Sequence, residues 1–425
     1  MPISQSFARR LFPILPKLAE EFGTPFHICD EEGIDQTCRG FNRAFRNVPG
    51  FRQHYAVKAL ANPEILKLMP KHGHGFDCSC PFENNLAIES GASNHEDIIF
   101  TSNDTTEKEF ELAIAAGAII NIDDVSLIRK VPRPFPELIC FRYNPGRKRK
   151  GNSIIGKPEE AKYGIMDSEV VPAYKEVERL GAKRFGIQSM ICSNQRDYRY
   201  IIETVLMLLR QCERLEEYAG IRCEFADIGG GFGIAYKPGD SSVDIVRIGE
   251  ETANLIDKFN SVHGWYPKIF TECGRFITGP HGLFVTRVIN CKRTYEIHVG
   301  VEAAMTGLMR PAIYGAYHHI TIRDENGRSC ENRKKEVVNV VGPICENWDR
   351  LATQRVLPVT REGDFVVTHD TGAHGSVMCF NYGSRPRHQQ LLLRKDGSVE
   401  RTMRAETDED LRATMHPPEK IWRSS

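Results

Sequence analysis

One lysine in this chain stands where it could do chemistry. Lys58 closes the apolar, β-prone run of residues 55–57, with the sequence YAV. Removing an ammonium group from water is costly, so a lysine at the end of a buried strand is expected to lose proton affinity and to react with a carbonyl. The alternative is a lysine whose charged end simply extends out of the core into water.

Two further motifs supply complementary groups. Gly229, Gly230 and Gly231 follow one apolar run, and Glu272 ends another. A glycine turn lets backbone N–H groups close on a phosphate, and a carboxylate can hold the proton of a pyridine nitrogen. Each motif also has a plain structural interpretation. The glycines can form a tight turn without a ligand, and Glu272 can form an ion pair with a neighbouring Arg or Lys. Taken with Lys58, they match the needs of pyridoxal 5'-phosphate, a cofactor that acts as an electron sink.

The elements that must position these residues alternate regularly along the chain. Strand-like apolar runs occupy residues 53–58, 75–79, 97–101, 118–122, 138–143, 184–189, 223–228 and 268–272. A helical pattern precedes each of these runs, at residues 34–46, 63–70, 82–90, 106–116, 124–130, 168–180, 196–217 and 246–262. Eight strands separated by helices over roughly 250 residues predict an α/β fold, a closed (β/α)8 TIM-like barrel. An open, doubly wound sheet is the alternative.

In such barrels function sits at the carboxyl ends of the strands. This chain places the following groups there: Lys58, Asp77 to Ser79, Ser102 and Asn103, Asp123, Arg142 and Asn144, Gln188, Gly229 to Gly231, and Glu272. The lysine, glycine and glutamate motifs are therefore predicted to meet at one end of the barrel. Residues 145–163, rich in Gly, Lys and Pro, are expected to form a long loop over that end.

After the barrel, the sequence pattern changes from alternating helices and strands to strands alone. A C-terminal β-rich domain is predicted from strand-like segments at residues 283–291, 294–300, 317–323, 335–341, 364–368, 377–381, 389–394 and 398–401. The predicted domains are an N-terminal segment at 1–31, whose strand at 25–29 pairs with the β domain, a cofactor-binding barrel at 32–280, and the β domain at 281–425.

Composition limits the partners. The 425 residues carry 56 Lys plus Arg and 56 Asp plus Glu, so nothing favours nucleic acid or an anionic membrane. The 13 cysteines are scattered without CxxC pairs, the N-terminus lacks a secretory signal and no apolar run is long enough to span a membrane. A reducing, cytoplasmic location and a small-molecule substrate are expected. No metal site is predicted.

From about Thr24 to Thr407 the chain resembles the fold-type III decarboxylases of pyridoxal phosphate, and within them the diaminopimelate decarboxylases. The resemblance rests on YAVKA at 55–59, FTSND at 100–104, FRYNPG at 141–146, GNSIIGKPEEAKYG at 151–164, IGGGFGI at 228–234, ECGRFITGP at 272–280, LMRPAIYGAYHHI at 308–320, CENWD at 345–349 and DTGAHG at 370–375. It implies an alanine-racemase-like barrel and decarboxylation of meso-2,6-diaminopimelate to L-lysine, a step of lysine biosynthesis.

The resemblance also implies roles for individual residues. Lys58 would carry the cofactor, Gly229, Gly230, Gly231 and Gly274 would contact its phosphate, and Glu272 its ring nitrogen. Arg275, Arg310 and Tyr314 would hold substrate carboxylates, and bidentate guanidinium recognition suits a substrate with two of them. On its own, Arg310 would be a surface ion-pair residue.

In the family, the segment equivalent to Cys345 and Glu346 reaches into the site of a neighbouring subunit. The resemblance therefore implies a homodimer in which Cys345 donates a proton and Glu346 reads the distal amino group. Without it, Cys345 would be an ordinary core cysteine. His374 stands where the family tends to place a tyrosine, near the phosphate.

At one position the chain departs from its family. Residues 185–190 read FGIQSM, so Gln188 occupies the place of a histidine that packs on the cofactor ring. An amide can stack and form hydrogen bonds, but it does not titrate near neutral pH. The alternatives are accordingly a decarboxylase acting on another amino acid, or a non-catalytic regulatory relative. A racemase is disfavoured because it needs two opposed bases.

Overall fold

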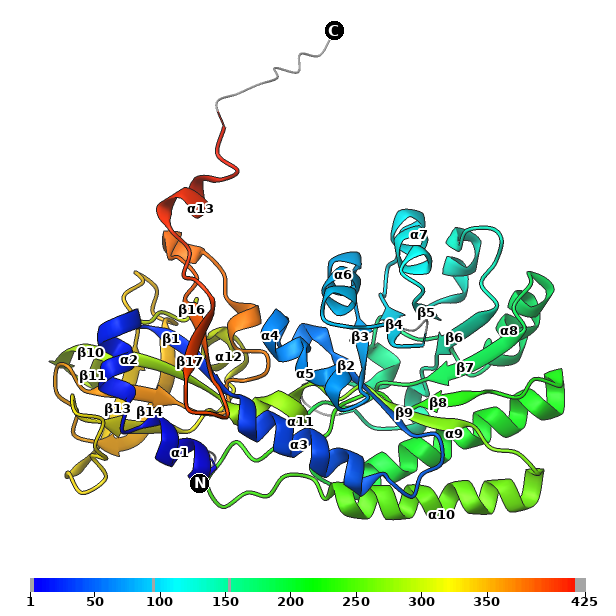
Figure 1. The fold of residues 1–425 in the computed structure, drawn as a ribbon, viewed down its shortest axis with the longest axis horizontal. Coiled ribbons are helices and arrows are strands. Elements are labelled where there is room, and N and C mark those ends of the chain that lie inside the picture. The colour runs from blue at the N-terminus through cyan, green and yellow to red at the C-terminus, as the bar shows by residue number, and fades with distance from the viewer. Residues whose placement is uncertain (1–3, 94–95, 152–153, 417–425) are drawn as a thin grey trace, which may run out of the picture. The chain divides into compact units, whose positions relative to one another are not determined.

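The computed structural model describes residues 4–93, 96–151 and 154–416, which form two compact units (Figure 1). The first consists of Glu31–His281 with the short segment Gly372–His374. The second consists of Gly282–Thr371 with residues 4–30 and 375–416. Each unit has its own sheet and core, so each is described by itself.

The first unit is a closed barrel whose strands are all parallel and follow one another in chain order. Its strands are β2 (Arg52–Ala56), β3 (Gly75–Cys78), β4 (Ile98–Thr101), β5 (Ile119–Ile122), β6 (Leu138–Arg142), β7 (Arg184–Gln188), β8 (Phe225–Asp227) and β9 (Lys268–Thr271). Its α-helices are α3 (Glu31–Ala44), α4 (Pro63–Leu66), α5 (Leu68–Lys71), α6 (Pro81–Glu89), α7 (Glu107–Ala115), α8 (Val170–Arg179), α9 (Tyr198–Ala219), α10 (Ile245–His263) and α11 (Arg275–Thr278). Its 3-10 turns are η1 (Val57–Ala59), η2 (Val125–Lys130), η3 (Gly146–Lys148), η4 (Pro158–Glu160) and η5 (Gly279–His281).

The barrel strands are short apolar runs because both faces of the sheet are covered. All residues of β3 and β5 are buried, one face packing inside the barrel and the other under the helices. Inside the barrel the rings of Phe225 and Phe270 stack 4.6 Å apart. A Cβ atom at Gly186 would lie 2.1 Å from the Phe225 ring, so this glycine makes room for the stack.

The two longest helices begin and end on local signals. Asp197 caps α9 and Asp244 caps α10, each carboxylate accepting a hydrogen bond from a backbone N–H in the first turn. Both helices end on a glycine in the left-handed conformation, Gly220 at φ 68° and Gly264 at φ 70°. None of the described helices is long and apolar enough to cross a membrane.

The second unit is built on a mixed sheet. Its strands are β1 (Phe26–Asp30), β10 (Gly282–Arg293), β11 (Ile297–Val301), β12 (Ile320–Arg323), β13 (Lys335–Val341), β14 (Arg350–Pro358), β15 (Phe365–Thr368), β16 (Gln389–Leu393) and β17 (Val399–Met403). They run in the order β14-β13-β11-β10-β1-β16-β17, with β15 pairing both β10 and β12. The unit also holds α1 (Gln5–Leu11), α2 (Leu15–Phe22), α12 (Met309–Tyr314), α13 (Asp408–Arg412), and the 3-10 turns η6 (Ser376–Met378) and η7 (Tyr382–Ser384).

The predicted fold class, a (β/α)8 barrel with a β-rich domain, is confirmed, and each of the eight barrel strands overlaps its predicted range. The expected pairing of the early strand is also present, because β1 pairs with β10 and β16. Three local predictions are wrong. Residues 377–381 are not a strand, residues 124–130 form a 3-10 turn rather than an α-helix, and strand β14 was not predicted.

Candidate active site

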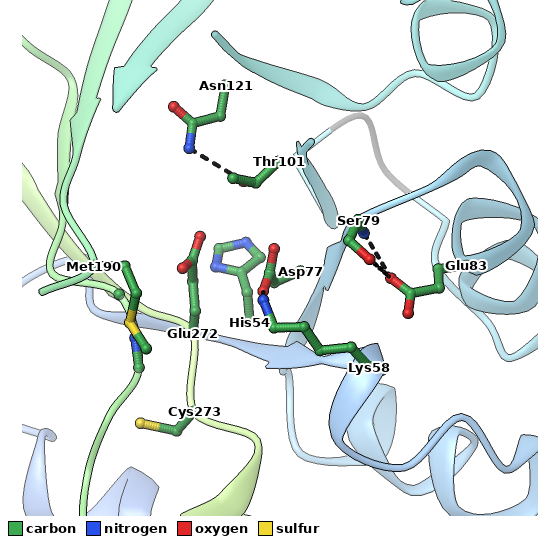
Figure 2. Close-up of polar contacts among 12 residues, drawn as sticks. His54, Lys58, Asp77, Ser79, Glu83, Thr101, Asn121, Met190, Glu272 and Cys273 are labelled. Atoms are coloured by element: carbon green, nitrogen blue, oxygen red, sulfur yellow. Dashed lines mark hydrogen bonds and ion pairs between the residues drawn. The ribbon is translucent and has the colours of Figure 1, made fainter. Parts of the chain in front are cut away.

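Lys58 does not end a strand. Strand β2 stops at Ala56, and Lys58 lies in the following turn η1. Its Nζ atom is 3.4 Å from Asp77 Oδ2, at the end of the adjacent strand β3 (Figure 2). The Lys58 side chain is 53% exposed whereas the Asp77 side chain is only 2% exposed. The prediction of a buried lysine is therefore wrong, although the lysine does stand at the carboxyl edge of the barrel.

The charge state of Lys58 also differs from the prediction. The Asp77 carboxylate raises the pKa of Lys58 above its ordinary value, an effect larger than the opposing effect of desolvation, and Glu272 adds to it. The two carboxyl groups therefore favour the protonated amine, which is the opposite of the effect expected from burial. To react with a carbonyl it must first give up a proton, and the adjoining carboxylates are placed to receive one.

Glu272 lies directly after β9 and is paired with Gln188, the last residue of β7. Gln188 Nε2 donates a hydrogen bond to Glu272 Oε2 at 2.9 Å, and both side chains are buried. Glu272 makes no ion pair within the described residues, so its plain alternative as an ion-pair residue does not hold. Its second oxygen, Oε1, is buried without a hydrogen-bond partner in the described part of the chain.

A third carboxyl group, Asp227 in β8, completes a buried acidic cluster with Asp77 and Glu272. Burial, then the charges of Asp227 and Asp77, raise the pKa of Glu272 well above its ordinary value. Burial also raises the pKa of Asp227 to about 7, although the Gly229 N–H donates to Asp227 Oδ1 at 2.8 Å and opposes the shift. Such a cluster disfavours a further anion and stabilises a cation, such as a protonated ring nitrogen.

The predicted phosphate-binding glycines are tightly packed. Gly229 and Gly231 have positive φ angles of 68° and 85°. A Cβ atom at Gly230 would lie 2.5 Å from the Glu272 carbonyl oxygen, and one at Gly274 would lie 2.5 Å from Ala59 Cβ. The glycines thus allow the turns after β8 and β9 to approach each other and η1, which brings the glycine turn next to Glu272.

Two further predicted residues belong to the first unit. Arg275, at the start of α11, donates from Nη1 to Tyr236 Oη at 2.5 Å and from Nη2 to Ser193 Oγ at 3.4 Å. His374 has a positive φ of 55°, and its backbone N–H donates to the Ala59 carbonyl at 2.8 Å. This bond ties the segment Gly372–His374 to the turn that holds Lys58.

The other four predicted residues belong to the second unit. Arg310 is buried in α12, and its Nη1 lies 3.1 Å from His318 Nε2, so it is not the surface ion-pair residue that its type alone suggests. Tyr314, on the same helix, is exposed. Cys345 is exposed, which excludes the core interpretation, and Glu346 Oε1 accepts a hydrogen bond from the Trp348 N–H at 3.1 Å.

Sequence reasoning missed the roles of Asp77 and Asp227. Asp77 was among the groups at the strand ends, but nothing in the order of residues pairs it with Lys58. Asp227 lies two residues before the glycine turn, which is the signal that could have drawn attention to it.

The model of the pyridoxal-dependent decarboxylase family, pyridoxal binding domain, matches residues 33–279. This chain is a member of that family. It is 43% identical over 411 residues to Protein TabA of Pseudomonas amygdali pv. tabaci, covering 96% of this chain and 95% of that protein. It is 32% identical over 411 residues to the diaminopimelate decarboxylase of Methanothermobacter thermautotrophicus, covering 95% of this chain and 94% of that protein.

Solved structures agree. A diaminopimelate decarboxylase from M. jannaschii in complex with L-lysine superimposes with a TM-score of 0.87 at 28% identity, covering 95% of this chain and 94% of that one. This member of the family is a pyridoxal-phosphate-dependent amino-acid decarboxylase.

The described residues fit the cofactor. Lys58 would supply an amine to hold it, and Glu272 Oε1, which has no hydrogen-bond partner among the described residues, would supply an acceptor for a ring N–H. When bound, pyridoxal phosphate supplies an electron sink for the bond that breaks.

Proposed function

We propose that this enzyme decarboxylates meso-2,6-diaminopimelate at its D centre and releases L-lysine and carbon dioxide. The observation that carries the proposal is the near-complete match, across both units, to diaminopimelate decarboxylases. The structural neighbour that carries L-lysine supports the choice of product.

In the first unit, the proposal assigns roles around the buried carboxyl cluster. Lys58 attaches the cofactor, and Asp77 takes up the proton that its amine must lose. Glu272 Oε1 holds the ring nitrogen while Gln188 keeps Oε2 occupied, so the carboxyl group cannot turn away. The glycines at 229–231 and Gly274 receive the phosphate, with His374 beside them.

The substrate is bound by cationic and polar groups. Arg275, Arg310 and Tyr314 bind its two carboxylates, and Glu346 binds the distal amino group. Cys345 returns a proton to the carbon that has lost carbon dioxide. Because Cys345 is exposed and Glu346 is only half-buried in the second unit, we propose that they act in the site of a second copy, which makes the enzyme a homodimer with shared sites. Thirteen free cysteines support a place in the reducing cytosol.

One observation favours a second candidate. Gln188 is hydrogen-bonded to Glu272 in the place where the family has a titratable histidine, so this enzyme could be adapted to another amino acid with a polar or carboxylated tail. Its 43% identity with Protein TabA, above the 32% shared with a diaminopimelate decarboxylase, is consistent with that alternative.

The test is a direct assay. Purified enzyme with pyridoxal phosphate is incubated with meso-diaminopimelate, and both carbon dioxide and L-lysine are measured. LL-diaminopimelate, L-ornithine, L-lysine and D-lysine serve as competing substrates, and Lys58→Ala enzyme measures the background. Turnover of meso-diaminopimelate with equimolar products supports the first candidate, whereas turnover of only another amino acid supports the second.

A further inference from the structure

The barrel carries a cavity formed by the loop after β6 and one face of α9. Its volume is about 330 Å³, and it is lined by Tyr143, Lys148, Arg149, Glu203, Leu206, Met207, Arg210 and Gln211. The residues from α9 are spaced three and four apart, so they form a single face of that helix. The basic run RKRK at 147–150 supplies two of the loop residues, and the proposed decarboxylation leaves this run without a role.

The charges around the cavity do not balance. Lys148 and Arg214 neutralise Asp167, at 2.9 and 3.2 Å, and Arg149 lies 3.4 Å from Glu203. Arg210 is exposed and forms no ion pair in the part of the chain that the structure describes. The cavity and its rim therefore hold an excess of positive charge, which favours an anionic ligand.

Arg149 lines this cavity and has one hydrogen-bond donor unused among the described residues. Its guanidinium lies 4.3 Å from the centroid of the Tyr200 ring, and Nη2 donates to the Tyr200 carbonyl at 2.9 Å. The Arg149 side chain is only 10% exposed, yet Nη1 is buried with no hydrogen-bond partner among the described residues. A buried guanidinium N–H without an acceptor is costly, and turning the side chain toward a ligand oxygen in the cavity would remove that cost.

We propose that this cavity binds a small organic anion. A carboxylate or phosphate head would accept hydrogen bonds from Arg149 and Arg210, and a short apolar body would lie on Leu206 and Met207. The cavity is joined to the active site through Tyr143, whose backbone N–H donates to the Gln188 carbonyl at 2.7 Å. The proposal does not depend on the identity of the decarboxylation substrate.

Calorimetric titration of the cofactor-loaded enzyme tests the proposal, because the cofactor then occupies its own phosphate site. Inorganic phosphate probes the head alone, hexyl phosphate probes head and body together, and hexanoate probes a carboxylate head. At low ionic strength, hexyl phosphate is expected to bind once per chain, at least about fivefold more tightly than inorganic phosphate, because its alkyl chain is buried. Binding should weaken as salt is added.

Three variants locate the site. Arg210→Gln should weaken hexyl phosphate binding at least about fivefold through loss of a charge-assisted hydrogen bond, and Arg149→Gln should do the same. Arg199→Gln is the matched control, since Arg199 lies on the same helix but pairs with Asp197 outside the cavity. Equal affinity for the two phosphates, or an Arg210→Gln enzyme that binds like the Arg199→Gln control, would overturn the proposal. Arg210 is exposed, so its replacement leaves folding intact.

Discussion

The barrel edge and the loop at residues 342–349 both carry candidate catalytic groups, but they hold them in opposite ways. At the barrel edge Asp77, Gln188 and Glu272 are buried and act on one another within a single chain. In the loop, the buried side chain of Asp349 fixes the backbone, its Oδ2 accepting a hydrogen bond from the Ile344 N–H at 2.8 Å, while Cys345 stays exposed.

The two regions therefore differ in what surrounds their candidate catalytic groups. At the barrel edge, residues of the same unit set the pKa of Lys58 and the hydrogen bonding of Glu272. The loop presents ordered but uncovered side chains, including Trp348 at 67% exposure, which is typical of a surface that acts on a partner. The two regions should therefore respond differently to mutation.

The largest effect is expected at the barrel edge, from Lys58→Ala. Loss of the amine should abolish the visible absorbance of the covalently attached cofactor and lower the decarboxylation rate by roughly 10⁴-fold or more. Borohydride treatment followed by mass spectrometry checks attachment. If the cofactor is still fixed covalently to the Lys58→Ala chain, Lys58 is not the anchor.

The function of the loop at residues 342–349 should instead be supplied by a second chain, so that an intact loop in one subunit restores the site of the other. When inactive Lys58→Ala and Cys345→Ala enzymes are mixed under conditions of subunit exchange, about half of the dimers become hybrids with one intact site. Activity should then recover to about a quarter of the wild-type value per dimer. Absence of recovery, with exchange confirmed by native mass spectrometry, would show that each site is built from one chain.

A smaller effect is expected at Gln188, where the barrel edge departs from its family. Gln188→His should leave cofactor affinity nearly unchanged and raise the rate on meso-diaminopimelate at least tenfold, about 1.4 kcal/mol of barrier. Gln188→Leu is the control, because it removes the hydrogen bond to Glu272 without adding a titratable group. If Gln188→His is no faster, and the wild-type enzyme is efficient on another amino acid, Gln188 determines specificity.

The smallest effect concerns stability. Burial raises the pKa of Asp227 from 3.8 to about 7, so the folded protein binds this proton more tightly than the unfolded chain does. The tighter binding of this proton stabilises the folded protein below about pH 4. This contribution to the free energy of unfolding is lost as pH rises to about 7.

The substitution Asp227→Asn removes the titrating carboxyl group, and with it the loss of stability as pH rises from 4 to 7. Relative to wild type, the cofactor-free variant should gain on the order of 1 kcal/mol or more in the free energy of unfolding between pH 4 and pH 7. Urea unfolding of both proteins at each pH measures this difference. Asp410→Asn is the control, since Asp410 lies in the second unit and its pKa is lowered by Arg404. If the difference in the free energy of unfolding between wild type and Asp227→Asn does not change with pH, the raised pKa of Asp227 is contradicted.

The sequence by itself determined the barrel and most of the candidate site. Eight apolar runs, each preceded by a helical pattern, suffice for a parallel barrel, and parallel strands bring their carboxyl ends to one edge. Lys58, Gln188, Glu272 and the glycines at 229–231 were therefore identifiable from their positions in the chain alone.

The tertiary structure decided which of these groups interact. In the register of the closed barrel, Ala56 lies opposite Asp77 and Gln188 lies opposite Asp227. These pairs are separated by 20 to 40 residues along the chain, and only barrel closure and strand register bring them together. The charge of Lys58 and the pKa of Glu272 follow from that register, because electrostatic effects depend on distance in space and on burial rather than on order in the sequence.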